Sequence, residues 1–119
     1  MKLAITSQGT DLDAAVDKRF GRAPHILIVN PETLDYEVLD NSENVNAFKG
    51  AGINAAVMVS GRDAGVLITG YCGPNAFRTL DAAHIRVSND AHGTVRETVE
   101  DYTAGRCSFL DGANVDGHW

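Results

Sequence analysis

Short apolar runs separated by polar turns fill the first third of the chain. Residues 2–6 lead into a β-branched run, and residues 25–29 (HILIV) are almost continuously apolar, which is typical of a strand covered on both faces. Asn30 and Pro31 indicate a turn, after which apolar and polar residues alternate over residues 36–40. This part of the chain therefore predicts three strands, of which the second and third form a hairpin.

A helical period replaces the strand pattern after residue 50. Residues 50–60 place Ile53, Ala56 and Val57 on one face of a predicted helix, and Gly61 follows where a C-terminal cap is usual. This segment is the first predicted helix.

Two further strand–helix pairs complete the pattern. Residues 66–69 predict a short buried strand, and Pro74 suits the first turn of a helix, where its missing N–H costs nothing. That helix carries an apolar stripe of Ala76, Phe77, Leu80 and Ala83. Residues 85–87 predict the fifth strand, and residues 94–105 predict a last helix that opens on a capping box formed by Thr94 and Glu97.

The order β-β-β-α-β-α-β-α predicts a ribonuclease H-like α/β fold of three layers. Its five-stranded mixed sheet has the expected order 3-2-1-4-5, with the second strand antiparallel to the others and helices on both faces. Residues 1–105 form the predicted single domain. Residues 106–119 show no apolar period and predict a mobile C-terminal tail.

In such a sheet, ligands bind beyond the carboxyl ends of the first and fourth strands. Four segments of the sequence meet at that edge. They supply the candidate binding residues Ser7, then Arg19, Gly21 and Arg22, then Gly70, Cys72 and Gly73, and finally Ser88, Asn89 and His92.

Cys72 immediately precedes a predicted helix, whose free N–H groups attract anions and lower the pKa of a nearby thiol. It is either a thiolate or sulfide-facing thiol, or a small half-buried side chain in a strand–helix turn. The segment 69–75 (TGYCGPN) looks like half of a thioredoxin site, but Asn75 stands where the second thiol would be. A dithiol mechanism is therefore excluded unless Cys107 approaches from the tail.

The stretch 18–22 (KRFGR) is the densest basic segment of the chain. It is either an anion clamp or a solvated loop whose charges balance Asp11, Asp13 and Asp17. The predicted fold favours the clamp, because Arg22 and the helix terminus at Cys72 reach the same edge of the sheet.

Charge and composition exclude several classes of protein. A formal net charge of −6 argues against binding nucleic acid by phosphate neutralisation. No run of 18 apolar residues suggests a membrane span, so the cytoplasm is the expected location. The first strand lacks the carboxylate that a two-metal nuclease needs, and the chain has no phosphate-loop motif.

The histidines and cysteines show no spacing typical of a metal cage. We therefore expect no direct ligation of a metal, with Cys72 as the one candidate ligand. His92 lies in a polar loop at the ligand edge, and an ordinary surface histidine is the alternative interpretation.

Five segments resemble the successive signature segments of the dinitrogenase iron-molybdenum cofactor biosynthesis family. They are residues 17–23 (DKRFGRA), 50–53 (GAGI), 69–76 (TGYCGPNA), 85–87 (IRV) and 93–95 (GTV), and the resemblance spans about residues 1–105. It implies a ribonuclease H-like fold and the binding or carriage of an anionic metal-sulfur cluster, without catalysis. Gly21, Arg22, Cys72 and Gly73 match the motif positions.

For the acidic single-domain members with a cysteine in that third segment, the resemblance implies a molybdenum-copper sulfide cluster held without protein ligands to the metals. It also implies an association with ATPases of the Mrp/ParA type. Two rival hypotheses stay open at this point. One is an interaction module that docks on such an ATPase, and the other is a thiol enzyme that uses Cys72 alone.

Overall fold

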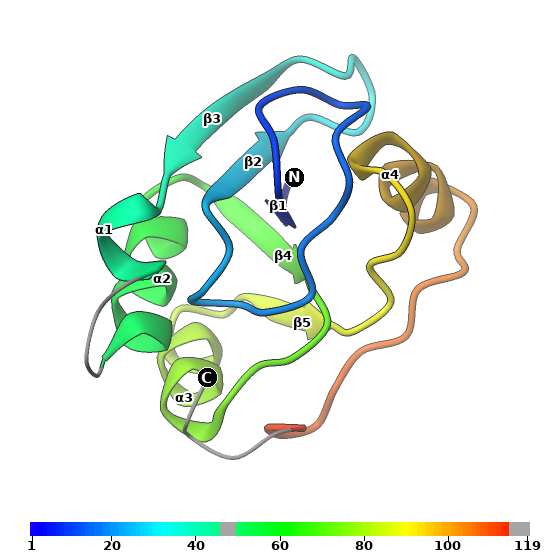
Figure 1. The fold of residues 1–119 in the computed structure, drawn as a ribbon. Coiled ribbons are helices and arrows are strands. Elements are labelled where there is room, and N and C mark those ends of the chain that lie inside the picture. Colours follow the sequence, from blue (N-terminus) through cyan, green and yellow to red (C-terminus); the bar gives the residue numbers. More distant parts are fainter. Residues whose placement is uncertain (46–49, 115–119) are drawn as a thin grey trace.

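The central strand of the sheet, β1 (Lys2–Ser7), pairs antiparallel with β2 (His25–Val29) and parallel with β4 (Ala64–Ile68). In this computed structural model, which describes residues 1–45 and 50–114, β3 (Tyr36–Asp40) and β5 (Arg86–Ser88) form the two edges. The order β3-β2-β1-β4-β5, with only β2 antiparallel to β1, confirms the predicted ribonuclease H-like sheet (Figure 1).

Helices cover both faces of this sheet. The helices α2 (Ala51–Ser60) and α3 (Pro74–Ala82) lie on one face, and α4 (Val95–Thr103) lies on the other (Figure 1). Each face has its own buried cluster, because successive side chains of a strand point to opposite sides. Ile26, Leu67 and Leu80 are among the first cluster, and Leu3, Ile5, Leu27 and Val95 are among the second.

The helix α2 begins at Ala51 and ends at Ser60, close to the predicted bounds, but the three residues predicted for one apolar face are not all buried. Ile53 and Val57 are 39% and 59% exposed, whereas Ala51, Ala55, Ala56 and Val59 are buried. The helix is apolar nearly all round, so its period does not identify the packed side. The small side chains face inward, where α2 packs closely on the sheet and on α3.

Three smaller differences concern element bounds. A short helix, α1 (Ser42–Val45), was not predicted. The strand β4 starts at Ala64 because that residue pairs with Lys2 across a register shift, and β5 runs from Arg86 to Ser88, where Ser88 pairs with Ile68. Of the stripe predicted for α3, Ala76 and Leu80 are buried, but Ala83 is the exposed C-cap.

The last helix agrees with its predicted start. The Thr94 hydroxyl accepts the Glu97 N–H at 3.1 Å, and a Glu97 carboxylate oxygen accepts the Thr94 N–H at 3.2 Å. This capping box satisfies two N–H groups that the helix itself leaves without partners.

The segment after α4 returns along β5 toward α3 (Figure 1). The Leu110 N–H donates to the Val87 carbonyl at 2.7 Å, the Ser108 N–H donates to Asp90 at 2.7 Å, and the Arg86 guanidinium lies 3.6 Å from the centre of the Phe109 ring. Residues 106–114 therefore differ from the mobile tail that the sequence predicts, and residues 115–119 lie outside the described residues. The domain boundary after residue 105 stays a prediction.

The long connection between β1 and β2 is fastened to the turn after β4. The Lys18 carbonyl accepts the N–H groups of Gly70 and Tyr71 at 3.1 and 2.6 Å, and the Phe20 N–H donates to the Tyr71 carbonyl at 3.2 Å. Gly70 permits this approach, since a Cβ there would overlap the Lys18 Cβ and lie 2.7 Å from the Lys18 carbonyl oxygen.

We expect Gly70→Ala to destabilise the protein by about 2 kcal/mol or more, because the added methyl group displaces a backbone that cannot move freely. Gly61→Ala is the matched control, since its Cβ would come no closer than 3.7 Å to any neighbour and the change should stay within about 0.5 kcal/mol. Urea unfolding of both variants measures the difference. Equal midpoints would contradict the close fastening of the two segments.

Candidate anion-binding site

Two helix N-termini and a basic loop converge at the carboxyl edge of the sheet. The chain enters α3 directly from that edge of β4, and α2 begins beside Gly21, whose added Cβ would lie 2.9 Å from the Gly52 nitrogen. Neither helix has a side-chain cap at its first turn, and neither has an acidic residue there. Both N-termini, with their partial positive charges, therefore lie at the edge of the sheet where the loop 17–22 passes.

A buried polar row supports the start of that loop. The Thr6 hydroxyl donates to the Asp17 carbonyl and lies 2.8 Å from the Thr69 hydroxyl, and the Asp17 N–H donates to the Thr6 carbonyl at 2.9 Å. All three residues are buried. Sequence reasoning missed Thr6 and Thr69, because threonines at strand ends carry no distinctive spacing.

Arg19 is paired within the loop. Its Nε and NH2 atoms lie 3.2 and 3.1 Å from the two carboxylate oxygens of Asp17, which is 3% exposed. The hydrogen bond and the charge of Asp17 raise the pKa of Arg19. Arg19 and Asp17 therefore balance each other's charge, as the alternative of a solvated loop predicts. Asp13 does not contribute to this balance, because it pairs with Arg96 at 2.9 Å.

Gly21 and Arg22 form the turn at the tip of the loop. Gly21 has a φ of 91°, a left-handed conformation that favours glycine, and its carbonyl accepts the buried Asn41 side chain at 3.3 Å. Arg22 is half-buried, and its N–H donates to the Arg19 carbonyl at 3.0 Å. Asn41 also donates to the Ala23 carbonyl at 2.8 Å, so it fixes this turn, a role that the sequence did not indicate.

Cys72 lies in the core, not at the surface of the crevice. Its side chain is fully buried in the same cluster as Phe20 and Ala76, and burial raises the pKa of its thiol to about 12. The prediction of a thiolate activated by the helix N-terminus is therefore wrong, because loss of water outweighs the helix dipole at this depth. The alternative, a small buried side chain in the turn, agrees with the structure.

The backbone around Cys72 is hydrogen-bonded to a distant part of the chain. Gly73 is the N-cap of α3, and Pro74 at its first position carries no N–H. The Cys72 N–H donates to the Asn114 side-chain oxygen at 2.9 Å, and the Asn114 side-chain amide donates to the Gly70 carbonyl at 2.8 Å. No sequence pattern connected Asn114 to this turn, because the contact depends on how the chain returns after α4.

The other predicted residues have local partners. The buried Ser7 hydroxyl donates to the Gly9 carbonyl at 3.0 Å, and the Ser88 hydroxyl lies 3.3 Å from an Asp90 carboxylate oxygen. Asn89 is exposed. A role for these three residues in binding stays a prediction.

His92 is directed to α4. Its ring pairs with Asp101, which also binds Arg106 at 2.7 Å, and the hydrogen bonds from His92 and Arg106 lower the pKa of the Asp101 carboxyl. The side chain is 55% exposed. This position favours a surface histidine, and its role in binding stays a prediction.

Backbone N–H groups and basic side chains are the candidate donors at this edge of the sheet. Within residues 1–45 and 50–114, no group of three or more His, Cys, Asp and Glu side chains could hold a metal ion. N–H groups and guanidinium groups suit a bulky anion that brings its own metal ligands.

In residues 1–45 and 50–114, no helix is long and apolar enough to cross a membrane.

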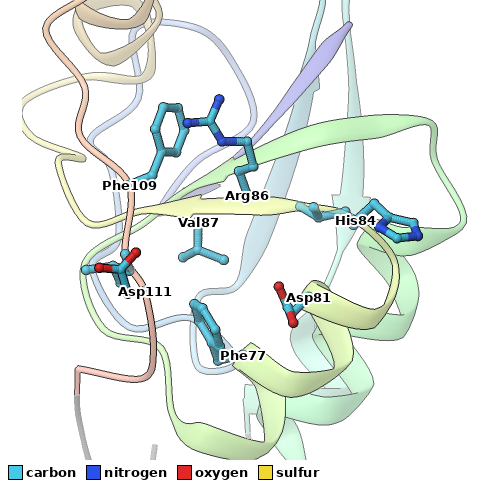
Figure 2. Close-up of a pocket in the computed structure, with 9 residues that line it drawn as sticks. Phe77, Asp81, His84, Arg86, Val87, Phe109 and Asp111 are labelled. Atoms are coloured by element: carbon cyan, nitrogen blue, oxygen red, sulfur yellow. The ribbon is translucent and has the colours of Figure 1, made fainter.

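A pocket of about 420 Å³ lies between α3, β5 and the returning tail (Figure 2). Phe77 and Val87 point toward each other inside it, and Asp81 and Asp111 lie at its margins (Figure 2). The tail therefore spans an open space before it reaches the turn at Cys72.

Known proteins resemble this chain over nearly its full length. The apo orange protein of Desulfovibrio gigas has 43% sequence identity, 96% coverage of both chains and a TM-score of 0.91. A NifB-like protein from Thermotoga has 32% identity, 98% coverage of both chains and a TM-score of 0.83. A dinitrogenase-like protein from Methanocaldococcus jannaschii, at 15% identity and a TM-score of 0.69 over 94% of this chain and 96% of its own, shares the fold.

No curated protein gives a significant match to the chain. The model of the dinitrogenase iron-molybdenum cofactor family matches residues 1–105. This family, which the sequence segments also resemble, indicates a role in binding a metal cluster or cofactor. The chain belongs to the dinitrogenase iron-molybdenum cofactor family.

Proposed function

We propose that the chain binds an anionic metal-sulfur cluster of the molybdenum-copper sulfide type as its cargo. The cluster is held without covalent bonds in the crevice between the loop 17–22 and the turn 70–73. The observation that supports this most is the convergence of two helix N-termini without side-chain caps on a loop that carries Lys18, Arg19 and Arg22.

Local charge supports an anionic cargo despite the acidic composition. Asp17 offsets Arg19, but Asp13 is engaged by Arg96 and does not neutralise the loop. Lys18 is exposed, and Arg22 is half-buried beside Gly21. The crevice therefore has a more positive surrounding than the net charge of −6 suggests.

The cargo is held through its sulfides and not through protein ligands to the metals. Cys72, the candidate ligand, would have to lose its proton and leave the core; its raised pKa opposes the first change and its packing in the core opposes the second. Backbone N–H groups, a guanidinium group and apolar contacts are sufficient for a bulky sulfide-rich anion, whose weakly hydrated surface is removed from water at small cost.

The protein has no catalytic turnover of its own under this proposal. A thiol enzyme needs an accessible thiolate, whereas Cys72 is buried and neutral at physiological pH. The cargo would be bound, carried and released.

An ATPase of the Mrp/ParA type is the proposed protein partner. Exposed apolar side chains on and near this edge support a docking role, namely Ile53 and Val57 of α2 and Tyr71, which is 42% exposed. Docking and cargo binding are compatible. If the apo-protein captures the ATPase as well as the loaded protein does, the interaction module becomes the better account.

Loading the apo-protein with tetrathiomolybdate and copper, followed by desalting, tests the proposed cargo. We expect retained molybdenum and visible absorbance, and we expect Arg22→Ala to weaken retention about tenfold or more because it removes a guanidinium group from the crevice.

Arg62→Ala is the matched control for that experiment. Arg62 pairs with Glu37 at 3.8 Å, away from the loop 17–22, and its loss changes the net charge equally. A colourless wild-type protein without molybdenum would refute the cargo, and equal losses in both variants would refute the site.

The buried thiol predicts a specific pH dependence of stability. The pKa of Cys72 is raised to about 12 in the folded protein, so above about pH 9 the unfolded chain loses this proton while the folded chain keeps it. The free energy of unfolding of Cys107→Ser should then fall, through this group, by about 1.4 kcal/mol per pH unit as the pH rises. The double variant Cys72→Ala/Cys107→Ser should lack this component. Parallel curves for the two proteins between pH 8 and 11 would show that Cys72 is not the neutral buried thiol described.

A further inference from the structure

We propose that the C-terminal segment 106–114 is a strap that closes the crevice in the cargo-free protein and is displaced when the anion binds. This inference rests on the proposed function and adds a means of regulating the same site. Its central contact is Asn114, which lies against the turn 70–72 although it is 42 residues distant from Cys72 in sequence.

Asn114 makes three hydrogen bonds to this turn. Its side-chain oxygen accepts the Cys72 N–H at 2.9 Å, its side-chain amide donates to the Gly70 carbonyl at 2.8 Å, and its backbone N–H donates to the Cys72 carbonyl at 3.3 Å. The oxygen and the amide group of this side chain are therefore both paired with backbone groups of the turn. A chance surface contact would not pair both.

The first of these bonds makes the strap a competitor of the cargo. The Cys72 N–H lies just before the N-cap of α3, where a bound anion would accept it, and it cannot serve both acceptors with full strength. In the cargo-free protein, the uncharged side-chain oxygen of Asn114 accepts this N–H in place of an anion. When Asn114 moves away from the turn, the Cys72 N–H loses its acceptor and becomes available to the anion. The Asn114 side chain then no longer covers the turn.

The strap has a firm part and a releasable part. Residues 108–110 are attached to the sheet through the Asp90 carboxylate, the Val87 carbonyl and the Arg86 guanidinium. Beyond them, Asp111 borders the open pocket of about 420 Å³ (Figure 2). Gly112 has no atom within 4 Å of an added Cβ, and Asn114 is exposed in spite of its hydrogen bonds. The tip can therefore leave while the attachment to β5 stays.

This division gives the strap a modest effect on affinity. The two side-chain hydrogen bonds of Asn114 must break before the cargo binds, so they lower the apparent affinity for the cargo by about 5- to 30-fold. The strap then holds the empty site closed and yields to a cargo that makes several charge-assisted bonds.

The variant Asn114→Ala tests the strap in the full-length protein with two readouts. In the apo-protein, amide hydrogen exchange at Cys72 should be about five times faster or more than in wild type, because its acceptor is lost. During titration with tetrathiomolybdate and copper, the midpoint of molybdenum binding should move to concentrations about 5- to 30-fold lower. Ser60→Ala, a polar truncation at the far end of α2, is the control and should change neither quantity.

A second variant acts on the attachment and leaves the turn at Cys72 intact. Phe109→Ala removes the ring that Arg86 covers, and it should also accelerate exchange at Cys72 and favour loading. A purely structural role for Asn114 predicts the opposite for loading, since a distorted turn would bind the cargo less well.

The outcomes separate this inference from the proposed function. If wild type retains molybdenum and Asn114→Ala binds it no more tightly, the strap does not compete and the inference fails alone. If neither protein retains molybdenum, the cargo is wrong, and the competition proposed for it falls as well. If Asn114→Ala binds molybdenum at lower concentrations than wild type and also exchanges faster at Cys72, the inference stands.

Discussion

The Lys18 carbonyl, which accepts the N–H groups of both Gly70 and Tyr71, is the contact on which the rest of the site depends. It joins the loop after β1 to the turn after β4, two segments that the sheet alone brings only to the same edge. Because the loop is held there, Phe20 reaches the core and Gly21 rests against the first turn of α2. Without this contact, the basic loop and the two helix N-termini would have no fixed relation.

This arrangement explains how an acidic protein can offer an anion site. The positive features are partly backbone dipoles, which do not enter the net charge, and partly guanidinium groups placed by neighbours such as Asp17. Another acidic group of the same segment, Asp13, pairs with Arg96 and not with the loop. The thiol contributes by filling the core beneath the turn, while the Cys72 N–H and carbonyl pair with Asn114.

The sheet order and the edge at which the loops meet could be predicted from sequence, because strand and helix periods, Pro74 and the Thr94 capping box are local signals. The inward face of α2 could not, since an almost uniformly apolar helix leaves the choice of side to tertiary packing. Whether the Cys72 thiol is protonated depends on its burial, because loss of water outweighs the helix dipole. The position of Cys72 before a helix does not reveal how deeply it is buried. Asn114 was missed for the same kind of reason, because its partners are set by the path of the tail.

The central claim is that the cargo is bound by backbone and guanidinium groups where the loop 17–22 meets the turn 70–73. Amide chemical shifts recorded before and after loading with tetrathiomolybdate and copper test it most directly. We predict the largest shifts at Gly21, Arg22, Cys72 and Gly73, with residues of the β2–β3 turn, such as Glu32 and Thr33, unchanged. Shifts concentrated at the β2–β3 turn, or in the pocket between α3 and β5, would contradict the account.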